Sequence, residues 1–487
     1  MYIMNYFLLP EILNTSINID NIELKYNDSN NNIAISKTLH FYLNKLKQEI
    51  DNYTSEWDNI KKYTNTYEFI HTTIPSLKIP VSKLKPISRS FYKMIEICNM
   101  FNILDHYNDC SIKSFHIAEG PGGFIEALNY MRKNDKDLYY GMTLIDNNPN
   151  VPGWEKNKNF LFNDSKVILE YGKDQTGNIL HKENLIHCYE KYNNTFDIIT
   201  GDGGFDFSVN FNMQETMASN LIFAEMCFAI STQKVGGTFI LKIFDIFSKT
   251  SLDIIYFLNL FYKQIHIVKP HSSRLANSEK YIVCSNFKQI DNYKEIIKKI
   301  INNYDYLNNS DNLLSSFINN YENLYFINKI EEINAIFGQQ QMENISYTLS
   351  MLYKNINLVN KIDQLKNNNI QKCIQWCNKY NIPYNNIHTN DINENFFLKK
   401  RLKIENDVSN NDVNIESDND GKFIKYISKN NMKHSKNYIT GALGCKLSHL
   451  QIIEDAKENN YDQILILEDD FLFCDNFIEK YNDIISN

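Results

Sequence analysis

The sequence contains no apolar run close to the roughly 20 residues that a membrane-spanning helix requires. Its N-terminus has neither the basic segment nor the cleavage site that mark a secretory signal peptide. Nine cysteines, an odd number without the spacing of a disulfide framework, favour free thiols in a reducing compartment. We therefore expect an intracellular, cytoplasmic protein that is not bound to a membrane.

A recognisable metal-binding motif is also missing, and no metal is expected. Cys373 and Cys377 are four residues apart, but no second Cys or His pair accompanies them, so core thiols are the better interpretation. The net charge of −8 gives no sign of nucleic-acid binding, and most of it lies after residue 390. Charge therefore neither supports nor excludes an RNA partner.

At 487 residues the chain is too long for one hydrophobic core, and its apolar content is that of a globular protein. Composition and hydrophobic pattern divide it into five segments. They are an N-terminal extension at 1–80, an α/β domain at 81–290, a helical extension at 291–390, an acidic Asn-rich linker at 391–430 and a small α/β fragment at 431–487.

The central stretch of the α/β domain runs from Phe115 to Leu128. A buried strand at 115–118 leads into the turn Gly120-Pro-Gly-Gly123 and then into an amphipathic helix that begins near Phe124. Because glycine has no Cβ, such a turn lets a ligand approach backbone N–H groups, and it places a helix N-terminus beside that ligand. A tight strand-to-helix connection without a ligand is the alternative, and the turn alone does not decide between them.

Further apolar runs of strand length alternate with helical patterns in the same domain. Strands are expected at 138–145, 196–200, 236–244, 265–268 and 281–287, with helices at about 214–231 and 251–262. Near-continuous apolar strands separated by helices indicate a mostly parallel sheet covered on both faces. Ligands of such sheets bind beyond the carboxyl ends of the strands. The Gly-rich turn, Asp202 and Lys242 are therefore expected to converge.

Four charged residues form the candidate chemical group: Lys93, Asp202, Lys242 and Glu279. For any one of them alone, a surface salt bridge is the simpler interpretation. Two lysines held together and partly desolvated would each have a depressed pKa, from a usual value of about 10.4, and a carboxylate would position the amine. A lysine in that state can serve as the general base for a hydroxyl group.

Five motifs of the domain occur in a recognisable order. They are Glu119-Gly-Pro-Gly-Gly-Phe124, Gly141-Met-Thr-Leu144, Asp202-Gly-Gly-Phe205, the run from Gly236 to Phe247 and the run from Lys269 to Cys284. In this order they resemble the FtsJ-like, S-adenosylmethionine-dependent ribose 2′-O-methyltransferases, in particular the eukaryotic and viral mRNA-cap branch. The resemblance implies a Rossmann-like fold, S-adenosyl-L-methionine as cofactor and RNA as partner, with the 5′ end of capped mRNA favoured.

The catalytic Lys-Asp-Lys-Glu tetrad of that family corresponds to Lys93, Asp202, Lys242 and Glu279. The resemblance implies that Lys242 deprotonates or aligns the ribose 2′-hydroxyl, that Asp202 and Lys93 lie beside it, and that Glu279 orients it. It also implies a set of cofactor-binding residues, namely Ser88, Ala118, Glu119, Gly120, Pro121, Gly122, Gly123, Phe124 and Asn178. Asn178 stands where the family usually has Asp near the adenine, and an amide can still hydrogen-bond there.

Two alternative functions stay open from the sequence. One is an FtsJ-type methyltransferase that acts on rRNA or tRNA, and the other is a catalytically idle RNA- or cap-binding scaffold. An intact tetrad argues against the idle scaffold. The Asn-rich composition and the unusual fusion of segments would suit a viral protein that acts in its host cell.

The C-terminal segment resembles a different family. Ile439 to Leu450, followed by Leu465-Ile-Leu-Glu-Asp-Asp470, is similar to the start of family 25 glycosyltransferases, whose acidic stretch holds a metal ion and a sugar nucleotide. The resemblance covers only about 430–487, without the downstream part of such a domain, so we expect no sugar transfer. The apolar strand at 464–467 should be covered by the rest of the chain or by a second copy, because an unpaired edge invites aggregation.

Overall fold

The computed structural model describes most of residues 5–387 and two short stretches beyond them. Residues 4–387 form one compact unit, and the described residues after 387 belong to a second unit. The described ranges are 5–12, 19–26, 33–75, 77–146, 148, 151–154, 164–204, 211–308, 312–319, 323–353, 358–387, 413–417 and 424–428.

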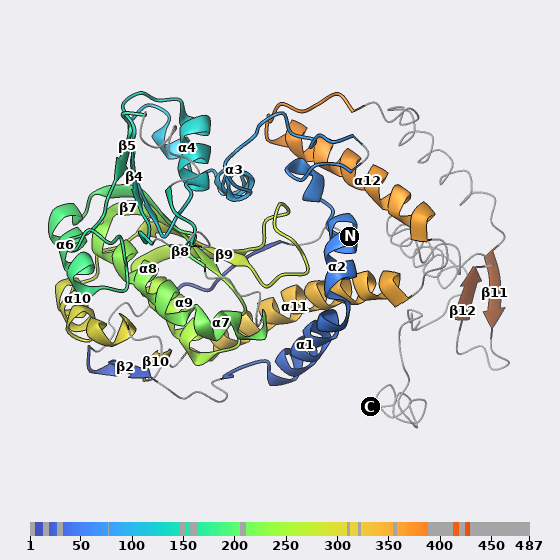
Figure 1. Cartoon of the computed structure of the whole chain (residues 1–487). Helices are drawn as coiled ribbons and strands as arrows, with labels where there is room; N and C mark the ends of the chain where they lie inside the picture. The colour runs from blue at the N-terminus through green and yellow to red at the C-terminus, as the bar shows by residue number, and fades with distance from the viewer. Residues whose placement is uncertain are drawn as a thin grey trace, which may run out of the picture. The chain divides into compact units, whose positions relative to one another are not determined.

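An eight-stranded sheet forms the centre of the larger unit (Figure 1). In spatial order its strands are β1 (Tyr6–Leu8), β8 (Tyr262–Val268), β9 (Lys280–Phe287), β7 (Gln233–Ile243), β6 (Phe196–Gly201), β3 (Lys113–Ile117), β4 (Leu138–Met142) and β5 (Val167–Leu169). The strands from β7 to β5 are parallel neighbours, whereas β9 is antiparallel to β7 and β8, and β1 is antiparallel to β8. The predicted Rossmann-like α/β fold with a mostly parallel sheet is confirmed.

Helices cover both faces of this sheet, so its strands can be apolar on both sides. On one face lie α6 (Lys182–Tyr192), α8 (Ser219–Thr232) and α9 (Lys249–Phe261), and on the other lie α3 (Ser90–Met100) and α4 (Gly123–Arg132). Side chains alternate between the two cores along β7, with Phe239 and Leu241 in the first and Ile240 in the second. Every residue of α8 is buried, which explains why its sequence is apolar on all sides.

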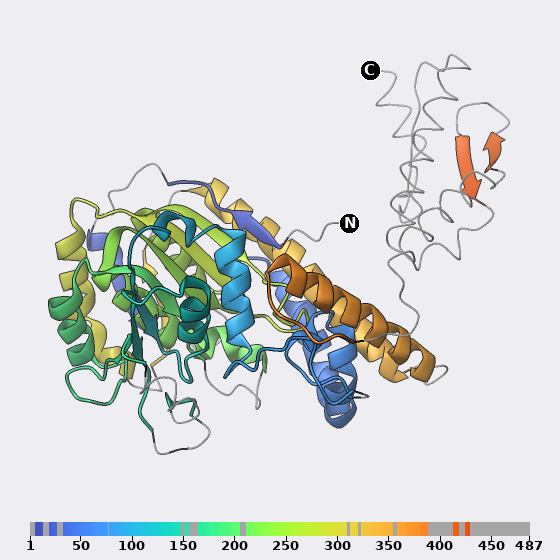
Figure 2. The ribbon, with the colours of Figure 1, turned by 90° about the horizontal axis from the view of Figure 1, so that it is seen from above.

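Segments from both ends of the larger unit pack around this core (Figure 2). At one edge β1 extends the sheet, and β2 (Ile22–Tyr26) pairs with β10 (Leu314–Ile318). The other described α-helices are α1 (Lys37–Glu49), α2 (Thr54–Thr64), α7 (Gln214–Met217), α10 (Tyr293–Asn302), α11 (Leu324–Tyr353) and α12 (Leu358–Lys379). Both views show α11 and α12, in orange, beside α1 and α2, in blue. Residues 291–387 are thus mainly helical, with β10 as a strand that the sequence pattern did not indicate.

In the second unit the structure describes two strands, β11 (Val413–Ser417) and β12 (Ile424–Ser428), which pair antiparallel. Both lie within 391–430, where the sequence predicted an acidic linker, so this part of the segment has regular structure. The predicted helix at 441–453 and the strand with its carboxylates at 463–470 lie outside the described residues.

Seven cysteines lie in the described part of the chain, and all of them are free thiols. Six are buried, including Cys373 and Cys377, which pack in an apolar core. Burial raises the pKa of both thiols, that of Cys377 to about 12, so they are inert structural groups. The core-thiol interpretation is confirmed. No helix in the described ranges is long and apolar enough to cross a membrane.

A buried carboxylate ties the N-terminal extension to the α/β domain. Glu68 accepts hydrogen bonds from Arg274 through both oxygens, at 2.6 and 2.9 Å, and from Arg89 at 3.0 Å. Arg89, at the start of α3, also donates to the carbonyl oxygen of Ser272 at 2.8 Å. Although burial raises the pKa of Glu68, the hydrogen bonds and charges of the two arginines lower it to about 2. Three separate parts of the chain therefore meet at one carboxylate.

We expect Glu68→Gln to lower the free energy of unfolding by about 3 kcal/mol at pH 7, because an amide leaves two arginines without a counter-charge. The folded-state pKa lies below the usual value of about 4.3. The stabilisation is therefore complete above that value and is lost as the pH falls toward 2. Urea unfolding at pH 7 and pH 3 should show the difference from wild type shrinking at the lower pH.

Glu23→Gln is the control for this prediction, because the Glu23 side chain is 61% exposed and its contacts with Lys25 and Asn319 lie at the surface. Equal losses in the two variants would contradict the central role of Glu68. So would a difference from wild type that does not change between the two pH values.

Candidate active site

Three parallel strands bring the candidate residues to one edge of the sheet. Ile117, which ends β3, pairs with Gly201, which ends β6, and Gly201 pairs with Leu241 near the end of β7. The next residues along β6 and β7 are Asp202 and Lys242, which therefore emerge side by side. This is the convergence predicted from a mostly parallel sheet. It arises because the carboxyl ends of β3, β6 and β7 are aligned along one edge of the sheet.

The predicted tetrad forms two ion pairs. Lys242 Nζ lies 2.6 Å from the backbone carbonyl oxygen of Asp202 and 3.3 Å from its Oδ1. Lys93, on α3, lies 2.7 Å from Glu279 Oε1 and 2.8 Å from Oε2. The four side chains are only 11–14% exposed, so they do not form the surface salt-bridge network that was the alternative.

Neighbouring groups join the two ion pairs. Tyr281 donates its hydroxyl to Asp202 Oδ1 at 3.0 Å, and its ring centre lies 5.9 Å from Lys93 Nζ. Ser273 donates its hydroxyl to Glu279 Oε1 at 2.8 Å. The tetrad is therefore one connected cluster on the face of the sheet that α3 and α4 cover.

The electrostatics of the cluster correct one prediction. Burial lowers the pKa of Lys242, but the charges of Asp202, Glu279 and Glu225 outweigh it, so the pKa of Lys242 is raised. The depressed value predicted from the sequence is wrong for this lysine, because three acidic groups face it. Burial raises the pKa of Glu279, but Lys93 and Lys242 lower it to about 2. Lys242 is therefore an ammonium group and Glu279 a carboxylate at neutral pH.

The Gly-rich turn leads from β3 into α4 through two residues with positive φ. Ala118 has a φ of 52° and Gly122 a φ of 101°, and the Gly122 N–H donates to the Glu119 carbonyl at 2.6 Å. Phe124, in the first turn of α4, donates its N–H to Glu119 Oε1 at 2.6 Å. Glu119 thus binds the turn at both ends and fixes the direction in which the helix begins.

Two glycines of the turn are required by packing within the protein. A Cβ on Gly123 would lie 2.1 Å from Ser88 Oγ and 2.2 Å from Ser90 Oγ, so the start of α3 touches the start of α4. A Cβ on Gly120, the residue before Pro121, would lie 2.3 Å from a backbone carbonyl oxygen. The structure therefore places Ser88 against the turn, with its hydroxyl already hydrogen-bonded to Ser90.

Glu119 carries an unused polar atom beside the turn. Its side chain is almost fully buried, and within the described ranges its Oε2 has no hydrogen-bond partner. Burial and the nearby Asp202 raise the pKa of this carboxyl well above its usual value. A buried oxygen without a partner is unfavourable unless a ligand supplies a donor. The amino group of S-adenosyl-L-methionine is such a donor, so the turn fits the cofactor that the resemblance implies.

Asn178 lies between β5 and α6, beside the carboxyl end of β4. The segment is held there by a hydrogen bond from the Ile145 N–H to the Thr176 carbonyl at 2.8 Å. The Asn178 side chain accepts the Leu180 N–H at 2.9 Å and lies 3.0 Å from His181 Nε2. The Asn178 side chain therefore stabilises the residues just before α6. Its contact with an adenine stays a prediction.

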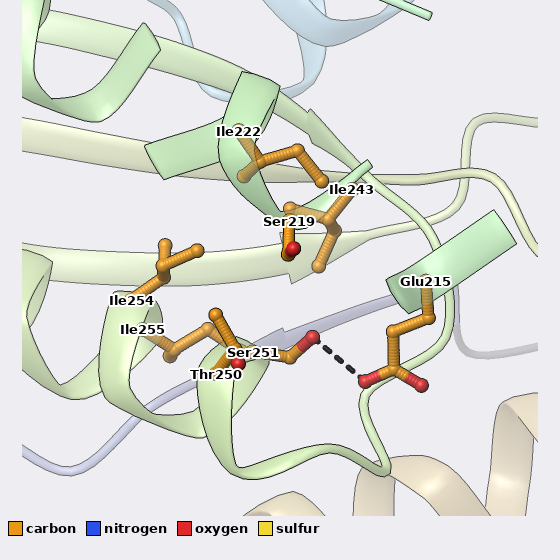
Figure 3. A pocket seen from close by; sticks show the side chains of 8 residues that line it. All are labelled: Glu215, Ser219, Ile222, Ile243, Thr250, Ser251, Ile254 and Ile255. Carbon is orange, nitrogen blue, oxygen red and sulfur yellow. Dashed lines mark hydrogen bonds between the residues drawn. The ribbon is translucent and has the colours of Figure 1, made fainter. Parts of the chain in front are cut away.

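A small pocket near the end of β7 has a structural role (Figure 3). Figure 3 shows Glu215 directed toward Ser251 of α9, which donates its hydroxyl to Glu215 Oε1 at 2.7 Å. Two backbone N–H groups of the preceding loop donate to the same oxygen at 2.9 and 2.7 Å. Ile243 lines this pocket and follows Lys242, so the two side chains point to opposite faces of the sheet. The pocket is therefore separate from the tetrad.

Two residues of the site were not predicted. Tyr281 links Asp202 to Lys93, but its place depends on the antiparallel pairing of β9 with β7, which a single sequence does not reveal. Glu225 is a lone acid in the apolar run of α8. A charged residue within an apolar helical run was visible in the sequence and could have marked this position.

Comparison with known proteins gives two family matches. The FtsJ-like methyltransferase family matches residues 86–287, and glycosyltransferase family 25 (LPS biosynthesis protein) matches residues 365–487. The first match contains all four tetrad residues. The second begins within α12, well before residue 431, which was the predicted start of the C-terminal segment. The carboxylates at 468–470 lie outside the described residues.

Curated relatives include cap-specific mRNA (nucleoside-2′-O-)-methyltransferase 2 of Drosophila melanogaster, which is 29% identical over 51% of this chain and 36% of that protein. The protein of the same name from Danio rerio is 27% identical over 65% and 43%. Cap-specific mRNA (nucleoside-2′-O-)-methyltransferase 1 of Trypanosoma cruzi is 34% identical over 35% and 47%. The chain thus spans less than half the length of these relatives.

Among solved structures, a putative ribosomal RNA methyltransferase from Plasmodium falciparum aligns with 41% of this chain and 97% of its own, at 23% identity. Its TM-score is 0.30.

We expect Gly122→Val to weaken binding of S-adenosylhomocysteine by about tenfold or more, because a valine is strained at a φ of 101° and would displace the turn. Calorimetric titration measures the affinity. Gly236→Val is the matched control, since Gly236 also has a positive φ, of 84°, but is exposed near the start of β7, far along the strand from Lys242. A folded Gly122→Val protein with unchanged affinity would mean that the turn is only a strand-to-helix connection.

Proposed function

Because residues 86–287 form an FtsJ-like methyltransferase domain, we propose that the chain methylates RNA, at the 2′-hydroxyl of a ribose near the 5′ cap of mRNA. The methyl donor is S-adenosyl-L-methionine. The observation that carries the proposal is the buried, connected cluster of Lys93, Glu279, Lys242 and Asp202 beside the Gly-rich turn. Charged groups gathered in this way are costly to bury, and their place at the carboxyl ends of the strands, beside the Gly-rich turn, supports a functional role.

The Gly-rich turn and Glu119 would hold the cofactor, and Asn178 lies at the same edge of the sheet. When bound, S-adenosyl-L-methionine supplies a methyl group on a positively charged sulfur. Transfer to a hydroxyl oxygen is an in-line displacement that depends above all on proximity and alignment. The task of the tetrad is therefore to hold the ribose hydroxyl and to manage its proton.

Lys242 is the residue that we assign to the hydroxyl. Asp202 fixes its ammonium group, and Tyr281 in turn fixes the Asp202 carboxylate. Because the pKa of Lys242 is raised, its charged side chain donates a hydrogen bond to the ribose oxygen and orients a lone pair of that oxygen toward the methyl group. The C–O bond forms as the S–C bond breaks, and the hydroxyl proton, made acidic by the new bond, passes to water. Lys242 can accept the hydroxyl proton only after losing its own, which the charges of Asp202 and Glu279 oppose. Of the two roles that the resemblance allowed, alignment is therefore favoured in the resting protein.

The names of the curated relatives, all cap-specific mRNA methyltransferases, support RNA as the substrate and favour capped mRNA over rRNA or tRNA. The catalytically idle scaffold is disfavoured by a tetrad whose members are all present and paired. The free thiols of the described part suit a reducing compartment, and we propose that the protein acts in the cytoplasm.

We expect Lys242→Met to lower the rate of methyl transfer by about 10²–10⁴-fold, the range typical of a lost acid–base or charge-stabilising group. Binding of S-adenosylhomocysteine should change little. Lys242→Arg should be nearly as damaging, because a guanidinium is planar and larger and cannot take the place of the ammonium group beside Asp202. Lys234→Met is the matched control, at a lysine of the same strand whose side chain is 53% exposed. A Lys242→Met rate within a few-fold of wild type would remove Lys242 from the mechanism.

The reaction itself is tested with labelled S-adenosylmethionine and transcripts that differ only in their cap. We expect the capped transcript to be labelled, the uncapped one not, and the label to map to a ribose 2′-oxygen near the cap. Equal labelling of both transcripts would favour the rRNA or tRNA alternative. No labelling by a folded protein that binds S-adenosylhomocysteine would favour the idle scaffold.

A further inference from the structure

One acidic residue at the site lies outside the tetrad. Glu225 belongs to α8, in which every residue is buried, and its side chain has no exposure to solvent. Its Oε1 accepts the Gly203 N–H at 2.8 Å, and its Oε2 has no hydrogen-bond partner in the described part of the chain. A buried carboxyl with one hydrogen bond is costly. Its presence in an apolar helix therefore requires a local reason.

That reason is a shared peptide group. The N–H of Gly203 and the carbonyl of Asp202 belong to one planar peptide unit. Glu225 binds its N–H side, and Lys242 binds its carbonyl side at 2.6 Å. Rotation of this peptide would break both contacts at once. Glu225 therefore fixes the direction in which the Asp202 carbonyl meets Lys242.

The glycines on either side of Asp202 leave room for this carboxyl. A Cβ on Gly201 would lie 3.0 Å from Glu225 Cδ, and a Cβ on Gly203 would lie 2.6 Å from Glu225 Oε1. Only a Gly-Asp-Gly turn lets α8 come close enough for the hydrogen bond without a clash. The absence of side chains at Gly201 and Gly203 thus makes room for the Glu225 carboxyl group of α8.

Three titratable groups face Glu225, each from a different element: Asp202 from the turn after β6, Lys242 from β7 and Glu119 from the Gly-rich turn. Because two of the three are acids, a further negative charge is unfavourable here. Burial raises the pKa of Glu225 to about 8, so the side chain is mostly uncharged at neutral pH. Its ionisation at higher pH would strengthen the hold of the acids on the Lys242 proton.

We propose that Glu225 is a positioning residue for methyl transfer, which holds the Asp202–Gly203 peptide against Lys242 through its hydrogen bond with the Gly203 N–H. The inference rests on the proposed function. Glu225 acts through the Asp202 carbonyl and has no contact with the reacting atoms. Two variants separate its features: Glu225→Gln keeps an acceptor for the Gly203 N–H and is uncharged at every pH, whereas Glu225→Met has a similar length without that acceptor.

In methyl transfer to capped RNA, we expect Glu225→Met to lower kcat by about 10–100-fold at pH 7 with little change in KM, because the Gly203 N–H is left unpaired. Glu225→Gln should restore nearly all of the wild-type kcat. Glu190→Met, at an exposed position of α6, is the control.

A second readout does not depend on activity. NMR titration of proteins with labelled lysines should give a lower pKa for Lys242 in Glu225→Gln than in wild type, because the amide removes one of the charges that raise it. An unchanged Lys242 pKa would overturn the charge coupling on which the inference depends.

The remaining outcomes are decisive in either direction. A Glu225→Met protein that binds S-adenosylhomocysteine and keeps the wild-type kcat would overturn the positioning role, as would a Glu225→Gln protein as slow as Glu225→Met. Where Glu225→Met does not fold, a Lys242 pKa that is the same in Glu225→Gln and in wild type would overturn it. Absence of methyl transfer by the wild-type protein would instead refute the proposed function, and the Lys242 titration would still test the contact with Glu225.

Discussion

The site depends on one constraint: each buried charge must lie beside a charge of opposite sign. Two lysines and two carboxylates lie together with little exposure, and each comes from a different element of the fold. A shift of α3, of the strand ends or of the loop before β9 would leave an unpaired charge in a nonpolar surrounding, at a cost of several kcal/mol, on the order of 3–5. Electrostatics therefore reinforces packing in holding the four elements in place.

The positions of most strands along the chain and the convergence of Asp202 and Lys242 could be predicted because each depends on a local signal. Apolar runs indicate buried strands, and polar residues that follow them must lie at one edge of a parallel sheet. The pKa of Lys242 could not be predicted, because its direction depends on how many acids face it, and Glu225 arrives from another helix. The bridge through Tyr281 depends on strand pairing, which no local pattern encodes. The same is true of β1, which is three residues long and joins the sheet edge through long-range contacts.

Support for the tetrad extends beyond the residues that match the methyltransferase family. Glu68 precedes that match, yet it holds Arg89 at the start of the helix that carries Lys93. Within the match, Lys269 donates to the backbone carbonyl of Glu279 at 2.9 Å and so fixes the residue that pairs with Lys93. The N-terminal extension therefore supports the site. Its polar sequence does not reveal this role, because the contact with Arg89 is made by a single buried side chain, Glu68.

The last described helix of the larger unit, α12, also supports the site from outside the methyltransferase match. Trp376, in α12, donates its indole N–H to Glu96 at 3.3 Å, and the same carboxylate accepts the Ser272 N–H at 3.0 Å. Glu96 lies on α3, one turn beyond Lys93. The family 25 match nevertheless begins at residue 365, within α12, whereas the contacts of α12 place it in the larger unit. A cut at residue 365 would open the core beneath Lys93. A truncation that keeps the larger unit whole must therefore end after α12, although the family match begins within that helix.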